Sequence, residues 1–287
     1  MLRIALPNKG RLNEECRELL ADAGLEVRAS SERSLRASLG GEFEAIFVRA
    51  QDIPEFVADG AADAGITGWD IVSESGRPIT SRLDLAFGRC SLVVAAREDG
   101  RVRTLDDIEA GTRVATVFPN ITRAFFAGIG RPIELVPVSG AVEIAPHLGI
   151  ADVILDLTST GSTLLVNGLR PIATVLESSA RLISATAPFT DPARTRALDE
   201  LVMALESVLI ARTRRYVMAN VPRARLEDVK RVLPGISGPT VIDVMNGGAM
   251  VAVHAVAPAD SIFRTIADLK ALGGEGILVT RIERLMP

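Results

Sequence analysis

The amino-acid sequence predicts an α/β protein with two similar α/β lobes that enclose a cleft, followed by a carboxyl-terminal ferredoxin-like βαββαβ domain. Through about residue 190, short apolar strands alternate with amphipathic helical segments, which is typical of parallel α/β architecture. From residue 216 the order becomes strand, helix, strand, strand, helix, strand, which is the ferredoxin-like order. The length of 287 residues exceeds one average domain and leaves room for both parts.

The elements of the two lobes form two series. The first has strands at 3–6, 45–48 and 62–66 and helices at 12–23 and 53–59. The second has strands at 91–96, 113–117, 133–136 and 153–155 and helices at 121–127 and 142–148. A long helix at 192–214 follows. The last unit has strands at 216–221, 240–244, 249–257 and 276–282, helices at 225–233 and 259–272, and a turn at 247–248.

A short similarity links the two series. Residues 60–66 and 149–154 both read Gly-x-Ala-Asp followed by an apolar strand. We interpret this as weak internal duplication, although chance also produces similarity over six residues. Ligands of open α/β sheets bind at the carboxyl ends of the strands. The cleft is therefore expected beside the loops at Thr67-Gly68 and Asp156-Leu157.

Composition excludes several classes of function. The 32 Lys and Arg residues face 36 Asp and Glu residues, so no global basic field is available for a nucleic acid. The aromatic residues are nine Phe, one Trp and one Tyr, too few for a base-stacking platform. Cys16 and Cys90 lack the spacing of a disulfide framework or a zinc site. No signal peptide or membrane-spanning apolar run is visible, so we expect a cytoplasmic protein without a membrane partner.

Residues 153–164 are the segment richest in chemical groups. An apolar strand ends at Asp156, four hydroxyl residues and Gly161 follow, and a helix begins near Ser162. Hydroxyl groups and backbone N–H groups at a helix start can donate to phosphate oxygens, and Gly161 permits close approach. Ser and Thr also cap helices, so the hydroxyl groups fit either a phosphate site or an N-cap. Asp156 suits a sugar diol or Mg²⁺.

Other residues leave two interpretations open. Lys9 is the first of three lysines, and it lies with Arg11 in a strand-to-helix turn, where it either faces the cleft or is an exposed loop charge. No Walker A or GxGxxG motif is present. His147 and His254 have no spaced partners and are expected to be structural or surface residues. Glu143 either lines the cleft or begins a helix.

Several segments resemble ATP phosphoribosyltransferase. They are Pro-Asn-Lys-Gly-Arg-Leu at 7–12, Phe-Val-Arg-Ala-Gln-Asp-Ile-Pro at 47–54, Gly-Ile-Thr-Gly-Trp-Asp at 65–70, Phe-Pro-Asn-Ile-Thr-Arg at 118–123 and the segment 143–169. The βαββαβ unit resembles the regulatory domain that marks the long form of this family. Together the correspondence covers essentially the whole chain.

The resemblance implies the first step of histidine biosynthesis. N1 of ATP displaces pyrophosphate from 5-phosphoribosyl 1-diphosphate, and Mg²⁺ is the required cofactor. The resemblance also implies lobes like those of periplasmic binding proteins, and a chain that assembles with itself as dimers and hexamers and is inhibited by histidine. Three domains are expected: lobe I at 1–90, completed by about 182–213, lobe II at 91–181, and the regulatory domain at 214–287.

The resemblance also assigns site residues. The phosphoribosyl group is assigned to Asp156, Thr158, Ser159, Thr160, Gly161, Ser162 and Thr163. ATP is assigned to Lys9, Gly10, Arg11, Arg49, Asp70 and Ser91, and catalysis to Lys9, Arg49 and Asp156. Histidine is assigned to Asn220, Ile236, Gly238, Thr240, Val256 and Gly276. The Mg²⁺ ligands stay unassigned.

The alternative from another class is a two-lobed solute-binding or sensor protein without catalysis. Two lobes of this kind fit such a protein equally well. The hydroxyl-rich loop and the lack of an export signal argue against it. A catalytically dead paralogue is disfavoured because Lys9, Arg49 and the complete loop are present.

Overall fold

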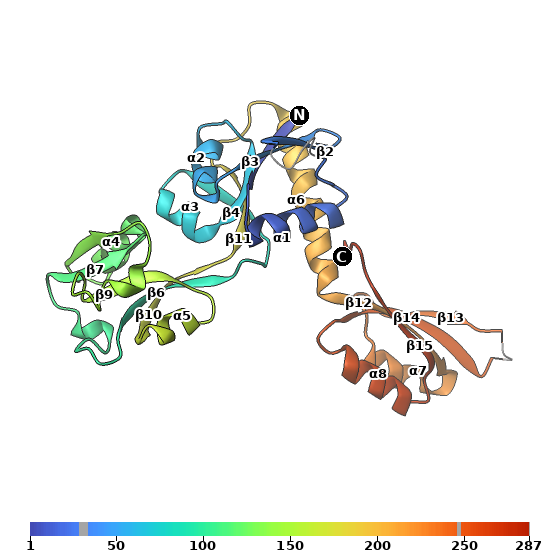
Figure 1. Cartoon of the computed structure of the whole chain (residues 1–287). Helices are drawn as coiled ribbons and strands as arrows, with labels where there is room; N and C mark the ends of the chain where they lie inside the picture. Colours follow the sequence, from blue (N-terminus) through green and yellow to red (C-terminus); the bar gives the residue numbers. More distant parts are fainter. Residues whose placement is uncertain (29–33, 246–247, 287) are drawn as a thin grey trace. The chain divides into compact units, whose positions relative to one another are not determined.

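The computed structural model describes residues 1–28, 34–245 and 248–286 (Figure 1). The chain divides into two compact units. The first comprises Met1–Glu18 and Leu25–Val202, and the second comprises Leu19–Gly24 and the chain from Met203 onward. Among the described residues, no helix combines the length and the apolar character that crossing a membrane requires.

The first unit contains two sheets, of which the first has six strands. Their order is β2 (Arg36–Gly40), β3 (Phe43–Val48), β1 (Leu2–Pro7), β4 (Ala64–Gly68), β11 (Ala180–Ala185) and β5 (Ile79–Asp84). Strands β3, β1 and β4 are parallel, whereas β11 is antiparallel to both β4 and β5. The helices of this lobe are α1 (Arg11–Asp22), α2 (Ile53–Ala58) and α3 (Trp69–Ser75), with a 3₁₀ turn at Ala50–Asp52.

The second sheet has five strands and the same plan. Their order is β10 (Leu169–Ser178), β6 (Cys90–Arg97), β9 (Val153–Thr158), β7 (Thr112–Thr116) and β8 (Ile133–Pro137). Without β2, the two sheets share one strand order and one pattern of parallel and antiparallel pairs. Its helices are α4 (Pro119–Gly128) and α5 (Ser162–Val166), with 3₁₀ turns at Leu105–Asp107 and Val142–Ile144.

The short sequence similarity occupies equivalent places in the two sheets. Asp63, before β4, accepts a hydrogen bond from Arg3 N at 2.8 Å, and Asp152, before β9, accepts one from Arg113 N at 2.9 Å. Each Asp also donates its own backbone N–H to the carbonyl of the same Arg at 2.9 Å. The repeated contact supports the interpretation of the two series as a duplication.

Within the described residues, the chain passes between the two sheets at two points. The first lies between β5 and β6, where Ala86 and Gly88 adopt φ angles of 61° and 62°. The second is Ser179, between β10 and β11. The return to the first sheet at Ala180 comes two residues before the expected position 182.

The second unit contains the ferredoxin-like domain that the sequence predicts. Its elements are β12 (Arg214–Pro222), α7 (Leu226–Val232), β13 (Thr240–Asp243), β14 (Met250–Pro258), α8 (Ile262–Ala271) and β15 (Glu275–Arg281), with a 3₁₀ turn at Arg223–Arg225. The antiparallel order is β13-β14-β12-β15. Val217, Val251 and Leu269 belong to its core. Of the expected turn at 247–248, residue 247 lies outside the described residues. The long helix α6 (Pro192–Arg212) precedes β12.

The structure differs from the sequence-based elements in two respects. The helix expected at 142–148 is wrong, because only the 3₁₀ turn Val142–Ile144 forms before further turns. Pro146 has no N–H to donate, and Gly149 adopts a φ of 68°. Strands β2, β5, β10 and β11 and helix α3 are additional to the predicted set. Pro171 in β10 is tolerated because β10 is an edge strand that has register shifts nearby.

Asp63→Ala is expected to destabilise the chain by about 1–3 kcal/mol, because it leaves the Arg3 N–H without its partner. The Asp63 side chain is only 4% exposed and also pairs with Arg194 at 2.8 Å. Asp152→Ala is the matched control, because its 43% exposed side chain can be replaced by water. Urea unfolding measures both changes. If Asp152→Ala lowers the free energy of unfolding as much as Asp63→Ala does, the argument is contradicted.

Candidate active site

A cavity of about 540 Å³ lies at the carboxyl ends of β4 and β9. These strands are equivalent in the two sheets, so their strand-to-helix turns meet across one space. The lining residues are Arg11, Leu12 and Glu15 of α1, Gly68, Asp70 and Ile71 beside β4, Leu157, Thr158, Ser159, Thr160 and Thr163 beside β9, and Gly88, Arg89, Cys90 and Ala180 at the crossovers. The cleft expected from the sequence is therefore present.

The hydroxyl-rich loop between β9 and α5 is held by its own side chains. Thr158 Oγ1 accepts a hydrogen bond from Gly161 N at 2.8 Å, and the hydroxyl groups of Thr160 and Ser162 lie 2.8 Å apart. The N-cap of α5 is Gly161, in the left-handed region with φ 76°, so none of the hydroxyl groups occupies the N-cap position itself. Ser159, Thr160 and Thr163 line the cavity and are exposed. Their exposure leaves these hydroxyl groups accessible to a ligand.

Asp156 lies one residue outside the cavity lining and is partly buried. Its Oδ1 accepts a hydrogen bond from Leu157 N at 2.8 Å. Burial raises the pKa of Asp156, and the neighbouring Glu143 carboxylate adds to the increase, which outweighs the lowering by the Leu157 N–H. The position of Asp156 is therefore unfavourable for a negative charge in the free chain.

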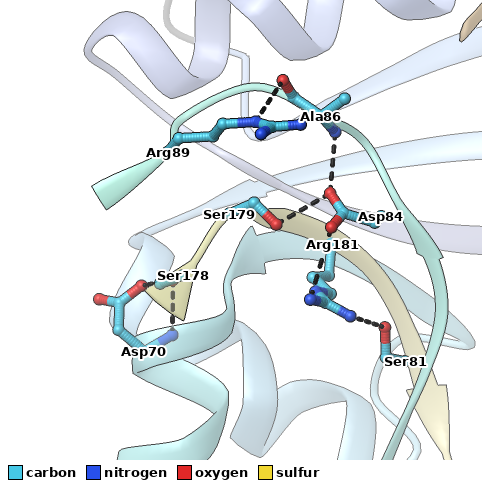
Figure 2. A network of polar contacts seen from close by, with 8 residues as sticks. All are labelled: Asp70, Ser81, Asp84, Ala86, Arg89, Ser178, Ser179 and Arg181. Carbon is cyan, nitrogen blue, oxygen red and sulfur yellow. Dashed lines mark hydrogen bonds and ion pairs between the residues drawn. The ribbon is translucent and has the colours of Figure 1, made fainter. Parts of the chain in front are cut away.

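Asp70 is fixed at the start of α3. The hydroxyl group of Ser178 accepts a hydrogen bond from Asp70 N at 2.9 Å and donates one to Asp70 Oδ1 at 2.6 Å (Figure 2). A Cβ at Gly68 would collide with Asp70 Oδ1 and force that carboxylate to move, so glycine at position 68 preserves its orientation. Burial raises the pKa of the neighbouring Cys90 thiol, and the Asp70 carboxylate raises it further. Asp70 therefore enters the cavity in one fixed orientation.

A polar network joins the two crossovers (Figure 2). Asp84 Oδ1 accepts hydrogen bonds from Ala86 N at 2.9 Å and from the Ser179 hydroxyl at 2.8 Å. Asp84 Oδ2 lies 3.4 Å from the guanidinium of Arg181. Burial alone would raise the pKa of Asp84, but these donors and the positive charge hold it below its ordinary value. Arg181 also stacks over the Trp69 ring, 5.1 Å from the centroid, and so connects the crossovers to α3.

The structure places the cations predicted to bind ATP in two different positions. Arg11 lines the cavity and pairs with Glu15 at 3.0 Å. Lys9 and Arg49 follow the paired strand ends Pro7 and Val48, so they share one edge of the first sheet. Both are exposed, and within the described part of the chain neither side chain has an ion-pair partner.

The remaining predicted residues lie in several places. Lys9, Gly10, Arg49, Ser91, Gly161 and Ser162 are not part of the cavity lining. The Ser91 hydroxyl donates to Glu177 Oε2 at 2.7 Å. In the second unit, Asn220 is a neighbour of Gly276, Thr240 pairs with His254 and Val256 pairs with Tyr216, whereas Ile236 and Gly238 lie in the turn before β13. Both histidines have structural contacts: His147 Nε2 lies 2.7 Å from Asn167 O, and His254 Nδ1 lies 2.9 Å from the Tyr216 hydroxyl.

Several lining residues were not predicted from the sequence, among them Leu12, Ile71 and Ala180. Glu15, Gly88, Arg89 and Cys90 also border the cavity. The expected boundary between lobe I and lobe II at residues 90–91 was the available signal for Arg89 and Cys90. Nothing in the local sequence distinguishes Glu15 from the other acidic residues of α1. Its Oε2 is buried and has no hydrogen-bond partner among the described residues.

A second cavity of about 690 Å³ lies in the second lobe, beside the start of β7 and the Asp152 turn before β9. Arg97 and Asp99 pair there at 2.7 Å, and Arg113 and Asp152 pair at 2.9 Å. This cavity lies at the amino ends of β7 and β9, whereas ligands of open α/β sheets bind at the carboxyl ends, so the first cavity is the better candidate site.

The cavity wall offers carboxylates to an Mg²⁺ ion carried by a substrate. Among the described residues, no three acidic, cysteine or histidine side chains gather into a metal site. Mg²⁺ bound to phosphates usually needs only one or two protein carboxylates. Glu15 and Asp70 supply two at the cavity wall.

Asp156→Asn is expected to be more stable than the parent at pH 7. The raised pKa means that the contribution of Asp156 to stability is complete below the unfolded-state pKa, near 3.8, and is lost as pH rises through the folded-state pKa. Asn stays neutral and can still accept from Leu157 N. Urea midpoints between pH 4 and pH 8 measure the difference, which should narrow toward acid pH. A parent chain that is the more stable one at pH 7 would contradict the burial argument.

Comparisons with known proteins give the family. The family model described as ATP phosphoribosyltransferase matches residues 49–221, and the model of the HisG C-terminal domain matches residues 211–284. The ATP phosphoribosyltransferase of Gemmatimonas aurantiaca is 70% identical over 292 residues and covers 100% of both chains. That of Halobacterium salinarum is 50% identical, covering 99% of this chain and 100% of its own.

A solved structure agrees with these matches. The ATP phosphoribosyl transferase (HisG:HisZ) complex from Thermotoga maritima has a chain with a TM-score of 0.63 and 27% identity, covering 73% of this chain and 98% of that chain. The predicted fold of two α/β lobes and a C-terminal ferredoxin-like domain is confirmed, and the chain is a phosphoribosyltransferase enzyme. The chain belongs to the ATP phosphoribosyltransferase family, in the long form with a HisG C-terminal domain.

Proposed function

We propose that the cavity between the two lobes is where this chain performs the reaction of its family. N1 of ATP displaces pyrophosphate from 5-phosphoribosyl 1-diphosphate, giving N1-(5-phosphoribosyl)-ATP, the first step of histidine biosynthesis. Two equivalent strand-to-helix turns, one from each lobe, border the same cavity, and this observation supports the location best. One turn offers hydroxyl groups and the other a fixed carboxylate, as two different substrates require.

The phosphoribosyl group is proposed to bind the β9–α5 loop. Thr160 and Thr163 border the cavity, and Gly161 allows a phosphate to approach the backbone closely. Thr158, Ser159 and Ser162 complete the hydroxyl set. Asp156 is proposed to accept hydrogen bonds from the ribose hydroxyl groups, which would provide donors for a carboxylate that is partly buried in the free chain.

ATP is proposed to bind the facing turn and the neighbouring sheet edge. Arg11 and Asp70 are in the cavity wall. Lys9 and Arg49, without ion-pair partners in the described chain, are available to the triphosphate or to pyrophosphate. Gly10 lets the backbone approach with φ 81°, and Ser91 is proposed as a further contact at the crossover.

The mechanism requires little proton transfer by side chains. Adenine N1 is already a nucleophile, and C1 of the ribose gains oxocarbenium character as pyrophosphate leaves. Positioning and electrostatic stabilisation therefore supply most of the acceleration. Mg²⁺, proposed as the cofactor, would neutralise charge on the diphosphate. The cations Lys9 and Arg49 are proposed to attract the departing pyrophosphate.

Turnover tests the proposal directly. The purified chain is incubated with ATP, Mg²⁺ and 5-phosphoribosyl 1-diphosphate, and the ultraviolet absorbance of the adduct is followed. A non-catalytic solute-binding protein, which the comparisons do not favour, would bind a ligand without producing adduct. Omission of Mg²⁺ is expected to abolish the signal.

Thr160→Val is expected to weaken 5-phosphoribosyl 1-diphosphate binding by about 1.5–3 kcal/mol, the usual loss for a hydrogen bond to a charged group. Valine keeps the shape of threonine and removes the hydroxyl group. Thr195→Val is the control, because Thr195 is exposed on α6 away from the cavity lining. Calorimetric affinities that are equal for parent and Thr160→Val would remove the loop from the phosphoribosyl site.

The ferredoxin-like domain is proposed to bind histidine as an inhibitor. Asn220, Thr240 and the turn at Ile236 and Gly238 would contact the zwitterion, and Gly276 and Val256 would border it. The chain is further proposed to assemble with itself as dimers and hexamers, with domain limits at 1–90 plus 182–213, 91–181 and 214–287. The cytoplasmic location stays a prediction.

Thr240→Val is expected to raise the histidine concentration for half-inhibition without changing turnover in its absence. Removing the hydroxyl group takes away one hydrogen bond to the ligand, and the coupling between inhibitor and active conformation is typically about 1–3 kcal/mol. Thr280→Val, on β15 of the same sheet, is the control. If Thr240→Val is half-inhibited at the same histidine concentration as the parent, Thr240 is not part of the histidine site.

A further inference from the structure

Helix α4 is capped by a residue from the other lobe. Its N-cap residue, Phe118, has no side-chain acceptor, and Pro119 at the first helical position has no N–H. The next two backbone donors, Asn120 N and Ile121 N, both reach the Glu74 carboxylate, one to each oxygen, at 2.9 and 3.0 Å. Asn120 Nδ2 also donates to the backbone carbonyl of Glu74 at 2.9 Å.

This contact joins the lobes at a place other than the crossovers. Glu74 belongs to α3, beside the first sheet, and Asn120 belongs to α4, beside the second, 46 residues later. A carboxylate at a helix N-terminus satisfies unpaired donors and interacts favourably with the helix dipole. The structure therefore holds α3 and α4 together through three hydrogen bonds to a single residue.

The same helix α3 reaches the cavity at its other end. Asp70 and Glu74 are one helical turn apart, about 6 Å along the axis. Asp70 is fixed to Ser178 at the end of β10, and Trp69 lies under Arg181 of β11. A short rigid helix thus connects the Asp70 position in the cavity wall with the N-terminus of a helix in the facing lobe.

We propose that Glu74 is a positioning residue for the transfer reaction, because its contact with α4 sets the spacing of the two strand-to-helix turns that border the substrate cavity. Each substrate is assigned to one of these turns. A change in their spacing therefore affects the meeting of adenine N1 with the ribose C1 atom, and not one substrate alone. This inference rests on the proposed function and adds a residue that contacts neither substrate.

The test compares Glu74→Ala and Glu74→Gln with the parent, using Glu109→Gln as the control for an exposed acidic residue of the second lobe. In Glu74→Ala, kcat/KM for both substrates is expected to fall together by about tenfold to a hundredfold, the effect of a misplacement near 1 Å. Glu74→Gln keeps one acceptor oxygen, so its kcat/KM values should lie between those of Glu74→Ala and the parent. Glu109→Gln should match the parent.

Two further measurements separate positioning from simple helix capping. Backbone amide exchange at Asn120 and Ile121 is expected to be about tenfold faster in Glu74→Ala, the size of a lost cap. ATP affinity measured by calorimetry should also fall. A cap without a positioning role would lower the melting temperature and accelerate exchange but leave both kcat/KM values and the ATP affinity unchanged, and this result would overturn the inference.

The experiment distinguishes failure of this inference from failure of the proposed function. If the parent chain does not form the adduct, the proposed function is wrong. A lower ATP affinity in Glu74→Ala would then still show that Glu74 positions the cavity wall, whereas faster exchange with unchanged ATP affinity would show only a helix cap. A fall in kcat/KM for only one substrate would make Glu74 a contact for that substrate and would also contradict the inference.

Discussion

The candidate site depends on one topological constraint, the arrangement of two equivalent sheets connected by two short crossovers. Parallel strands end at the same edge of a sheet, so the loops after β4 and β9 carry the groups that a ligand can reach. The two crossovers border the same cavity through Arg89 and Ala180. Asp84 and Ser179 hydrogen-bond between the crossovers, which fixes the place where the lobes meet. This arrangement suits a transferase for two polyphosphate substrates, because its chemistry depends on positioning.

Charge placement around the cavity is asymmetric. Asp70 has its hydrogen-bond partner in the free chain, whereas Asp156 has a raised pKa and, among the described residues, only the Leu157 N–H as a donor. Lys9 and Arg49 lack ion-pair partners within the described residues. The proposed substrate contacts would stabilise both the Asp156 carboxylate and these unpaired cations. Binding sites commonly contain such groups, which lower the stability of the protein without its ligand.

Local patterns in the sequence predicted most of the fold. Alternating apolar segments indicated β1, β6 and β9, and the order of elements after residue 216 indicated the ferredoxin-like domain. The segment 169–185 was left unassigned because Pro171 argues against a strand and no Gly or Asn marks the point at Ser179 where β10 ends and β11 begins in the other sheet. The failed helix at 142–148 shows that apolar spacing does not outweigh Pro146. For the site, the β9–α5 loop was visible in the sequence as a run of hydroxyl residues. Glu15 and Glu74 were not, because their roles arise from contacts between distant segments.

A crystal structure of the full chain with 5-phosphoribosyl 1-diphosphate and Mg²⁺ would test the central claim most directly. We expect the 5-phosphate on the hydroxyl and backbone N–H groups of residues 158–163, with the diphosphate directed toward the turn that contains Asp70. Density for the ligand in the second cavity, beside Arg97 and Arg113, with the β9–α5 loop empty, would contradict the assignment of the site to the carboxyl ends of β4 and β9.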